Sequence, residues 1–243
     1  MGHGPLSPHG AGQSGAARMG YVKNGPVLVV TGTLREAALI SGEGIEVLAG
    51  GSDPQRLQAE LEAMAPYVAG IISFGMCGAI DHTLKLGDFV IGKRVSGAFH
   101  AKCDERWVSA LKQALPLAWC GSIYADGHML ALQRDKAVQA WMSAALAADM
   151  ESHLAARVAA EHDLPFVVLR CVSDRAEVDL PPAVTVMMAP DGGVDVGAVA
   201  RSVWEQPAQL RELAGTLAGF AKAFQMLSSG TKKLRGRLAF DQR

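Results

Sequence analysis

The sequence lacks a strong net charge, aromatic residues and closely spaced cysteines. Its 23 Lys and Arg residues nearly balance its 24 Asp and Glu residues, so no overall field attracts DNA or RNA. Aromatic residues make up 6% of the chain, which argues against a surface that stacks nucleic-acid bases. The four cysteines form no CxxC pair and offer no complete zinc site, so we expect reduced thiols, a cytoplasmic protein and no metal.

The chain also lacks a long uninterrupted apolar run. Its longest uncharged stretch, residues 64–80, contains one proline and three glycines and is too short to span a membrane. The N-terminal region is rich in Gly, Ser, His and Pro, without the apolar segment of a signal peptide. We therefore expect a disordered leader over residues 1–24, one folded domain over 25–228 and a basic tail over 229–243.

The hydrophobic content is 49% and the charged content is 19%, which excludes disorder over most of the chain. Short β-branched apolar runs alternate with segments of helical periodicity. Runs at 27–30, 68–74 and 165–173 predict strands that are buried on both faces, whereas 54–64 and 151–162 predict helices. This alternation predicts a single-domain α/β fold, with a mostly parallel or mixed sheet flanked by helices.

Parallel strands direct their carboxyl ends to one edge of a sheet, where α/β proteins bind ligands. Two acidic residues, Glu151 and Asp174, follow predicted strands at that edge. Glu151 begins a predicted helix, whose dipole favours a charged carboxylate that accepts hydrogen bonds from hydroxyls. Asp174 ends a buried strand, where desolvation can favour the protonated form needed for acid catalysis. Each residue alone is equally compatible with a helix cap or a solvated loop.

Several motifs of other enzyme classes are absent. The chain has no GxGxxG fingerprint, no phosphate-binding P-loop and no GxSxG nucleophile elbow. A nicotinamide-dependent enzyme, an ATP-dependent enzyme and a serine hydrolase are therefore poorly supported.

Four segments resemble the nucleoside phosphorylase and nucleosidase superfamily, namely Ile71–Ile80, Thr83–Asp88, Asp149–Ser152 and Val172–Asp174. This superfamily includes methylthioadenosine/adenosylhomocysteine nucleosidases and bacterial purine nucleoside phosphorylases. Within it, the chain most resembles the hopanoid-associated phosphorylase branch, on the segments 50–54, 148–153, 180–182 and 190–192. The resemblance implies the nucleoside phosphorylase-like fold and an enzyme that cleaves the N-glycosidic bond of an adenine nucleoside.

The resemblance also implies roles for residues around the sugar and the base. Asp174 would protonate N7 of the leaving adenine, with Ser173 beside it. Glu151 would bind the 2′- and 3′-hydroxyls of the ribose, and Met150 would pack beneath the sugar.

At the base, His128 would lie against the purine ring. Met129 would read the edge of the purine through its backbone. A core or surface histidine is an equally good interpretation of His128 from the sequence alone.

The resemblance leaves the nucleophile open. Nucleosidases orient water with a glutamate in the first loop, where this chain has Glu36, although the strict match of spacing is Ala37. Phosphorylases bind phosphate with an arginine and a serine near the third strand, where this chain has Ser73 and Met76. The familiar phosphate site is therefore altered, and Met76 favours a more apolar pocket.

A different anion site could serve phosphate instead. Arg35, the backbone amides of Gly51 and Ser52, and the turn at Gly75 could form a nest beside Met76. A plain turn is an equally good interpretation of the glycine pair that ends at Gly51.

The resemblance to the hopanoid-associated branch implies phosphorolysis of adenosylhopane to adenine and a ribose-1-phosphate hopanoid, as a pentosyltransferase of hopanoid biosynthesis. Phosphate would be the co-substrate, with no cofactor, and the relatives imply a homo-oligomer. One alternative is a hydrolytic nucleosidase acting on small 5′-thio adenosines, and another is a non-catalytic nucleoside-binding protein. The basic tail could give peripheral contact with anionic lipid, or it could be a solvated, frayed terminus.

Overall fold

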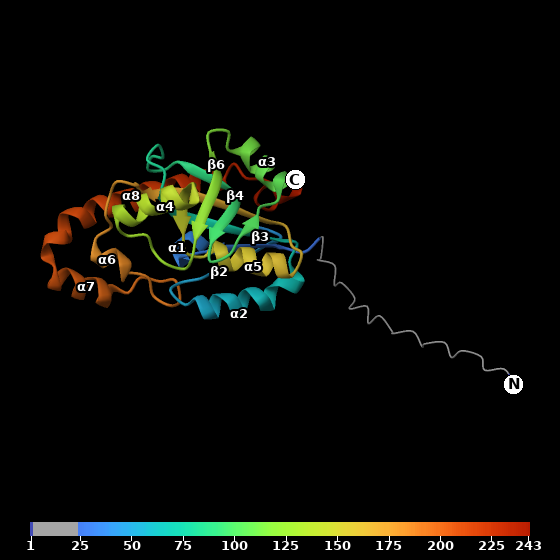
Figure 1. Cartoon of the computed structure of the whole chain (residues 1–243), viewed down its shortest axis with the longest axis horizontal. Coiled ribbons are helices and arrows are strands. Elements are labelled where there is room, and N and C mark those ends of the chain that lie inside the picture. The colour runs from blue at the N-terminus through green and yellow to red at the C-terminus, as the bar shows by residue number, and fades with distance from the viewer. Residues whose placement is uncertain (2–23) are drawn as a thin grey trace.

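The computed structural model describes Met1 and residues 24–243. The expected leader, residues 1–24, therefore lies almost entirely outside the described residues. Within the described part of the chain, the fold is an eight-stranded sheet flanked by helices, which confirms the predicted α/β class (Figure 1).

The sheet is mixed. Its strands are β1 (Val27–Thr31), β2 (Ile45–Ala49), β3 (Gly70–Ala79), β4 (Phe89–Gly97), β5 (Ala101–Lys102), β6 (Trp119–Ala125), β7 (Ala145–Asp149) and β8 (Phe166–Asp174). Strand β1 pairs in parallel with β2 and β3, and β3 pairs in parallel with β8. Antiparallel pairs join β3 to β7 and β4 to β8, while β6 pairs in parallel with β4 and β7. These pairings close β3, β8, β4, β6 and β7 into a ring, which the sequence pattern does not predict.

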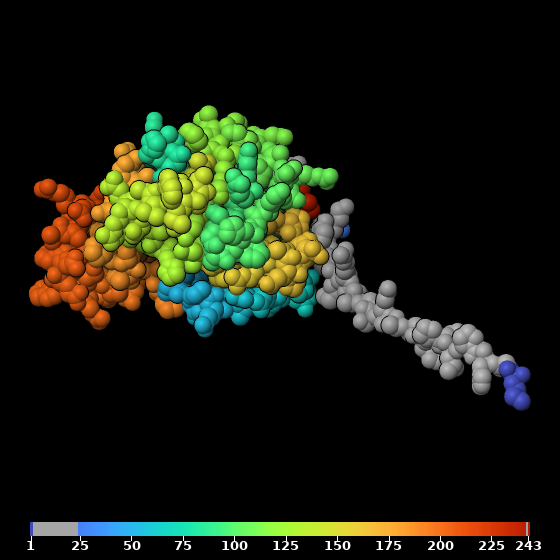
Figure 2. Space-filling model, in the orientation of Figure 1, coloured from blue at the N-terminus to red at the C-terminus, as the bar shows by residue number. Residues whose placement is uncertain are grey.

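The helices are α1 (Leu34–Ala37), α2 (Pro54–Met64), α3 (Glu105–Ala114), α4 (Gln133–Ser143), α5 (Ser152–Glu161), α6 (Pro182–Thr185), α7 (Val196–Glu205), α8 (Leu210–Thr231) and α9 (Gly236–Ala239). Helix α5 packs on β3 and β8 and is covered in turn by α2, whereas α8 packs on β8 from another side. Helix α7 and the beginning of α8 form one end of the molecule, seen in orange and red in Figures 1 and 2.

Local sequence signals explain the elements that position the site. All nine residues of β8 are buried, as its nearly continuous apolar run predicts for a strand covered on both faces. Helix α2 begins where Asp53 accepts hydrogen bonds from the backbone N–H groups of Gln55 and Arg56, with Pro54 as its first residue. No helix among the described residues is both long enough and apolar enough to cross a membrane.

The C-terminal residues are packed against the domain. The ring of Phe240 meets that of Trp107 edge to face, with centroids 4.9 Å apart, and both rings are buried. The indole N–H of Trp107 donates a hydrogen bond to the carbonyl of Leu238. The expectation of a solvated, frayed terminus is therefore wrong for residues 238–240, because their apolar side chains complete the core beside α3.

Candidate functional site

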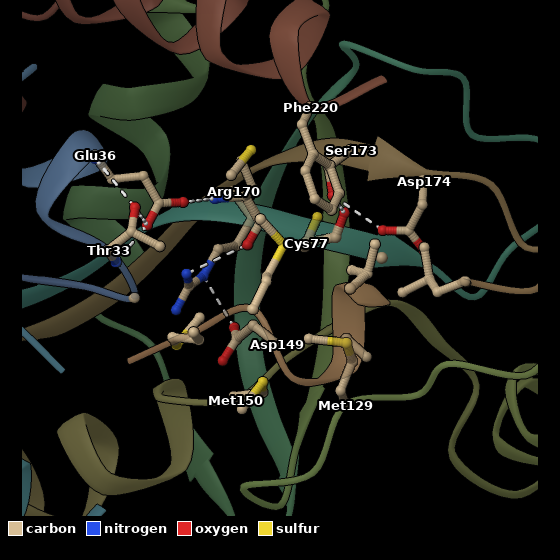
Figure 3. Close-up of a pocket in the computed structure, with 18 of the residues that line it drawn as sticks. Thr33, Glu36, Cys77, Met129, Asp149, Met150, Arg170, Ser173, Asp174 and Phe220 are labelled. Carbon is tan, nitrogen blue, oxygen red and sulfur yellow. Dashed lines mark hydrogen bonds and ion pairs between the residues drawn. The ribbon is translucent and has the colours of Figure 1, made fainter. Parts of the chain in front are cut away.

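A cavity of about 630 Å³ opens where β1, β3 and β8 end (Figure 3). Glu36, Glu151 and Asp174, which lie far apart in the sequence, all line it. The structure thus brings together Glu151 and Asp174, which the strand ends predicted, and Glu36, which the resemblance implied, at the sheet edge where α/β folds bind ligands.

Arg170 contacts two of the carboxylates at the bottom of this cavity. It lies on β8, and its side chain is fully buried. Its Nε lies 3.0 Å from a carboxylate oxygen of Asp149, and one terminal nitrogen lies 3.2 Å from Glu151. The same terminal nitrogen donates to the hydroxyl of Ser73. A buried guanidinium needs such partners, because burying an unpaired charge is costly.

Glu151 is held in an environment that resists ionisation. Burial raises its pKa from the ordinary 4.5 to about 7, and the nearby charges of Asp149 and Glu36 act in the same direction. Arg170 opposes this shift without cancelling it. The net direction is opposite to the one expected from the helix dipole, because desolvation outweighs the dipole at this depth.

Glu36 joins two parts of the site. One carboxylate oxygen accepts hydrogen bonds from the backbone N–H and the hydroxyl of Thr33, each at 2.9 Å, in a capping box at the start of α1. The other oxygen accepts from the backbone N–H of Met76, at 2.7 Å. The side chain is buried, and it lies against Gly75 and the guanidinium of Arg170. The Thr33-x-x-Glu36 spacing is the sequence signal that could have placed this carboxylate.

Asp174 forms a second buried ion pair, which the sequence did not reveal. The ammonium of Lys136 on α4 lies 2.7 Å from one carboxylate oxygen, and the hydroxyl of Ser173 donates to the other at 2.9 Å. Ser173 therefore lies beside the acid, as the resemblance implies. Lys136 was missed because its partner is 38 residues away in the chain.

His128 and Met129, expected at the nucleobase, and Met150, expected beneath the ribose, all line the cavity. The side chain of His128 is 84% exposed. The imidazole of His128 lies 3.6 Å from the carboxylate of Asp126, toward solvent. His128 therefore lies at the rim of the cavity, with most of its side chain in solvent.

The expected anion nest is not available. The backbone N–H of Gly51 donates to Gly32, and that of Ser52 donates to Ala189, so neither is free to bind phosphate. A Cβ on Gly51 would lie 2.2 Å from the carbonyl oxygen of Pro190, which explains the glycine by close packing. The prediction that Gly51 and Ser52 bind phosphate is therefore wrong.

The remaining residues of the predicted anion site are Arg35, Met76 and Gly75. Arg35 and Met76 line the cavity, and the guanidinium of Arg35 lies 5.0 Å from the ring centroid of Phe224. Gly75 adopts φ +148, which residues with a side chain rarely adopt, and a Cβ there would lie 2.7 Å from Glu36 and 3.0 Å from Arg170. It therefore serves the close approach of these two side chains.

The segment that follows α6 forms a wall of the cavity. It is fastened by main-chain groups, since Leu34 donates its backbone N–H to Gly192 and Ser52 donates to Ala189. The side chain of Arg56 also donates to the carbonyl of Pro190. Apolar side chains face the cavity from this wall and from α8, namely Val184, Met187, Met188, Val194, Leu217, Phe220 and Phe224.

Comparison with solved structures finds the same fold in proteins of low sequence identity. A mutant of the Helicobacter pylori 5′-methylthioadenosine nucleosidase with 5′-methylthioadenosine in its active site has 14% identity and a TM-score of 0.59, over 86% of this chain and 99% of that chain. Futalosine hydrolase of Helicobacter pylori has 13% identity and a TM-score of 0.61, over 86% and 97%. The Streptococcus pyogenes S-adenosylhomocysteine nucleosidase with 5-methylthiotubericidin has 16% identity and a TM-score of 0.57, over 89% and 100%.

No curated protein sequence matches the chain significantly. The family model described as the Phosphorylase superfamily matches residues 4–210, which is most of the chain. This match agrees with the sheet, the acidic cavity and the structural neighbours, and the chain belongs to the Phosphorylase superfamily.

Proposed function

We propose that this protein hydrolyses the N-glycosidic bond of an adenosine that carries an apolar group on its 5′ carbon. The observation that carries the proposal is the cavity itself. It brings Asp174, Glu151 and Glu36 together in one cavity with apolar side chains that include Phe220. A polar side suits the base and the sugar, and an apolar side suits the 5′ group.

The bond between C1′ of the ribose and N9 of adenine breaks through a ribose cation. Asp174 gives a proton to N7, so the electron pair of the broken bond enters a neutral leaving group. Glu151 accepts hydrogen bonds from the ribose hydroxyls. Above its raised pKa of about 7 the carboxylate is ionised, and its negative charge then stabilises the developing cation more than the ground state. Met150 lies where it can pack against the sugar.

Water suits this site as the nucleophile better than phosphate does. Arg170, the buried guanidinium, is already paired with Asp149 and Glu151, and Glu36 adds a third carboxylate beside it. A phosphate dianion there would meet like charges in a site of low dielectric constant. Glu36 can instead accept a proton from water as the water oxygen bonds to C1′. The products are adenine and the 5′-substituted ribose.

Phosphorolysis, which the sequence favoured, remains the second candidate because of one observation. Arg35 lines the cavity on the side of α8, with its guanidinium against Phe224. An arginine at this place could bind a phosphate that enters from the mouth.

The apolar wall supports a bulky 5′ group. Methionine side chains at 187 and 188 adapt to irregular apolar ligands, and three large residues of α8 extend the surface. Together with the resemblance to the hopanoid-associated branch, this wall leads us to propose adenosylhopane, in hopanoid biosynthesis, as the substrate.

Adenine release tests the proposal directly. Methylthioadenosine and a 5′-long-alkyl adenosine are each incubated with the full chain, with and without phosphate, and adenine and sugar products are measured by chromatography. We expect phosphate-independent release, a free reducing sugar, and a preference for the alkyl substrate. Release that requires phosphate and yields a sugar 1-phosphate would replace hydrolysis with phosphorolysis. Binding of adenine without any turnover would leave a nucleoside-binding protein.

A further inference from the structure

Helix α4 sends one buried side chain into the core, that of Lys136. This side chain is 1% exposed, although lysine is among the residues least often buried. Its ammonium donates to the carboxylate of Asp174 at 2.7 Å, to the carbonyl of Arg175 at 2.8 Å and to the carbonyl of Val178 at 3.1 Å.

These three acceptors define the charge of Lys136. An ammonium group has three N–H donors, and each of them is used here. A neutral amine would leave one of these acceptors without a donor. The group is therefore held as a cation, and the carboxylate of Asp174 supplies the counter-charge that its burial requires.

The carboxylate of Asp174 is held from α4, from β3 and by its neighbour on β8. Lys136 holds one oxygen and Ser173 holds the other, and the carboxylate lies close against Gly78 on β3, where a Cβ would stand 2.9 Å from it. The buried thiol of Cys77 on β3, whose pKa burial raises, is a further ionisable group near it. Among the described residues, Lys136 is the cation that forms an ion pair with the proposed acid.

We infer that Lys136 is a positioning residue that orients Asp174 and sets the pH range in which its carboxyl carries the proton for N7. This inference rests on the proposed function. A neighbouring positive charge opposes protonation of a carboxylate.

The test compares K136M, K136R and wild type by the pH dependence of kcat/KM for adenine release. Activity that depends on a protonated Asp174 falls as the pH rises. We expect K136M to lower kcat about a hundredfold, as loss of an oriented acid does. We also expect the pH at which kcat/KM decreases to be higher by one pH unit or more, because the positive charge that opposes protonation of Asp174 is gone. K136R keeps the charge and should stay within about tenfold of wild type, a difference of 1.4 kcal/mol.

R134M is the matched control. Arg134 lies on the same helix, but its side chain is 81% exposed, so its loss removes one positive charge without touching the acid. We expect its pH profile to match that of wild type. A K136M variant with reduced activity and an unmoved profile would show a structural role only, and it would overturn the inference.

Removing Lys136 can also unfold the protein, because it leaves a buried carboxylate unpaired. Carbon-13 NMR titration of the Asp174 carboxyl in wild type and K136R gives a readout that needs no turnover. We expect the midpoint in K136R to stay near that of wild type, and that in folded K136M to rise. The double variant K136M/D174N removes both charges and should fold better than K136M alone. If wild type releases no adenine, the proposed function fails, and the titration still tests Lys136 by itself.

Discussion

The carboxylate of Glu36 accepts a hydrogen bond from the backbone N–H of Met76 at 2.7 Å, although 40 residues separate the two in the chain. The other oxygen caps α1 through Thr33. One side chain thus joins the first helix to the end of β3. Each carboxylate oxygen can accept more than one hydrogen bond, so the oxygen that faces Met76 can also hold a water molecule.

Replacing Glu36 by glutamine should separate the two tasks of this side chain. The amide oxygen can still accept from Met76, but the amide cannot take a proton from water. Its NH₂ group then faces the two donors of Thr33, so circular dichroism must check that the variant is folded. We expect kcat for adenine release to fall 10²- to 10⁴-fold, as loss of a general base does. Glu43→Gln, at an exposed position, is the control and should leave kcat unchanged. If E36Q retains kcat within tenfold of wild type, a group other than Glu36 must accept the proton from water.

Asp174→Asn should abolish most of the activity. Asparagine cannot protonate N7, so we expect kcat to fall by about 10³-fold or more. Because the change leaves Lys136 buried without its counter-charge, the melting temperature should fall as well. Circular dichroism at the assay temperature checks that the variant is folded. Activity within about tenfold of wild type, equivalent to 1.4 kcal/mol, would remove Asp174 from the role of acid.

Gly78→Ala tests whether the position of the acid matters. A Cβ at Gly78 would stand 2.9 Å from a carboxylate oxygen of Asp174, so the carboxylate must move. We expect kcat to fall at least tenfold in a folded protein. Gly215→Ala is the matched control, since a Cβ there meets nothing within 4 Å. Gly215 lies within α8, so its replacement should stabilise the protein by about 0.5–1 kcal/mol and leave kcat unchanged.

Stability should depend on pH through Glu151. The folded protein holds a proton on this carboxyl up to about pH 7, whereas the unfolded chain loses it near 4.5. Between these values the folded state binds more protons, so the free energy of unfolding falls as the pH rises. Glu151→Gln carries no such proton, and its stability relative to wild type should rise across this window. Urea unfolding at both ends of the window measures the change, and a flat difference would contradict the raised pKa.

Phe240→Ala tests the packing of the C-terminal residues. The ring is buried against Trp107, so its removal should lower the free energy of unfolding by about 3–5 kcal/mol. Leu117→Ala, at a side chain that is 95% exposed, should change stability by less than about 0.5 kcal/mol. Denaturant unfolding curves of both variants and of wild type give the free energies of unfolding to be compared. Equal stability of F240A and wild type would mean that the terminus is not part of the core in solution.

The sequence predicted the elements and residues that follow from local pattern. The apolar runs of β1, β3 and β8 predicted buried strands, and parallel strands bring their ends together. Asp174, which ends β8, could therefore be placed at this edge of the sheet from its position in the sequence. Glu151 reaches the same cavity from β7, which pairs antiparallel with β3, so the rule for parallel strands does not account for its position. The resemblance assigned them roles, because the Met150-Glu151 and Ser173-Asp174 pairs are specific motifs.

The charged partners of these residues could not be predicted in the same way. Arg170 lies inside an apolar strand and Lys136 lies on an otherwise exposed helix, and neither has its partner at helical or strand spacing. Ion pairs of this kind depend on tertiary contacts between distant segments. The spacing of apolar residues along the sequence gives no information about such contacts. The predicted nest at Gly51 and Ser52 was wrong for the same reason, since the segment near Pro190 occupies those amides.

The wall near Pro190 is fastened by its backbone rather than by its side chains. Leu34 and Ser52 donate main-chain hydrogen bonds to it, and Gly51 lets the two backbones touch. The side chains of Met187, Met188 and Val194 take no part in those bonds. Mutation can therefore enlarge or shrink the space for the 5′ group while the wall keeps its place. Because the backbone holds the wall and the side chains shape the cavity, a few changes of side-chain size could alter which ligands fit.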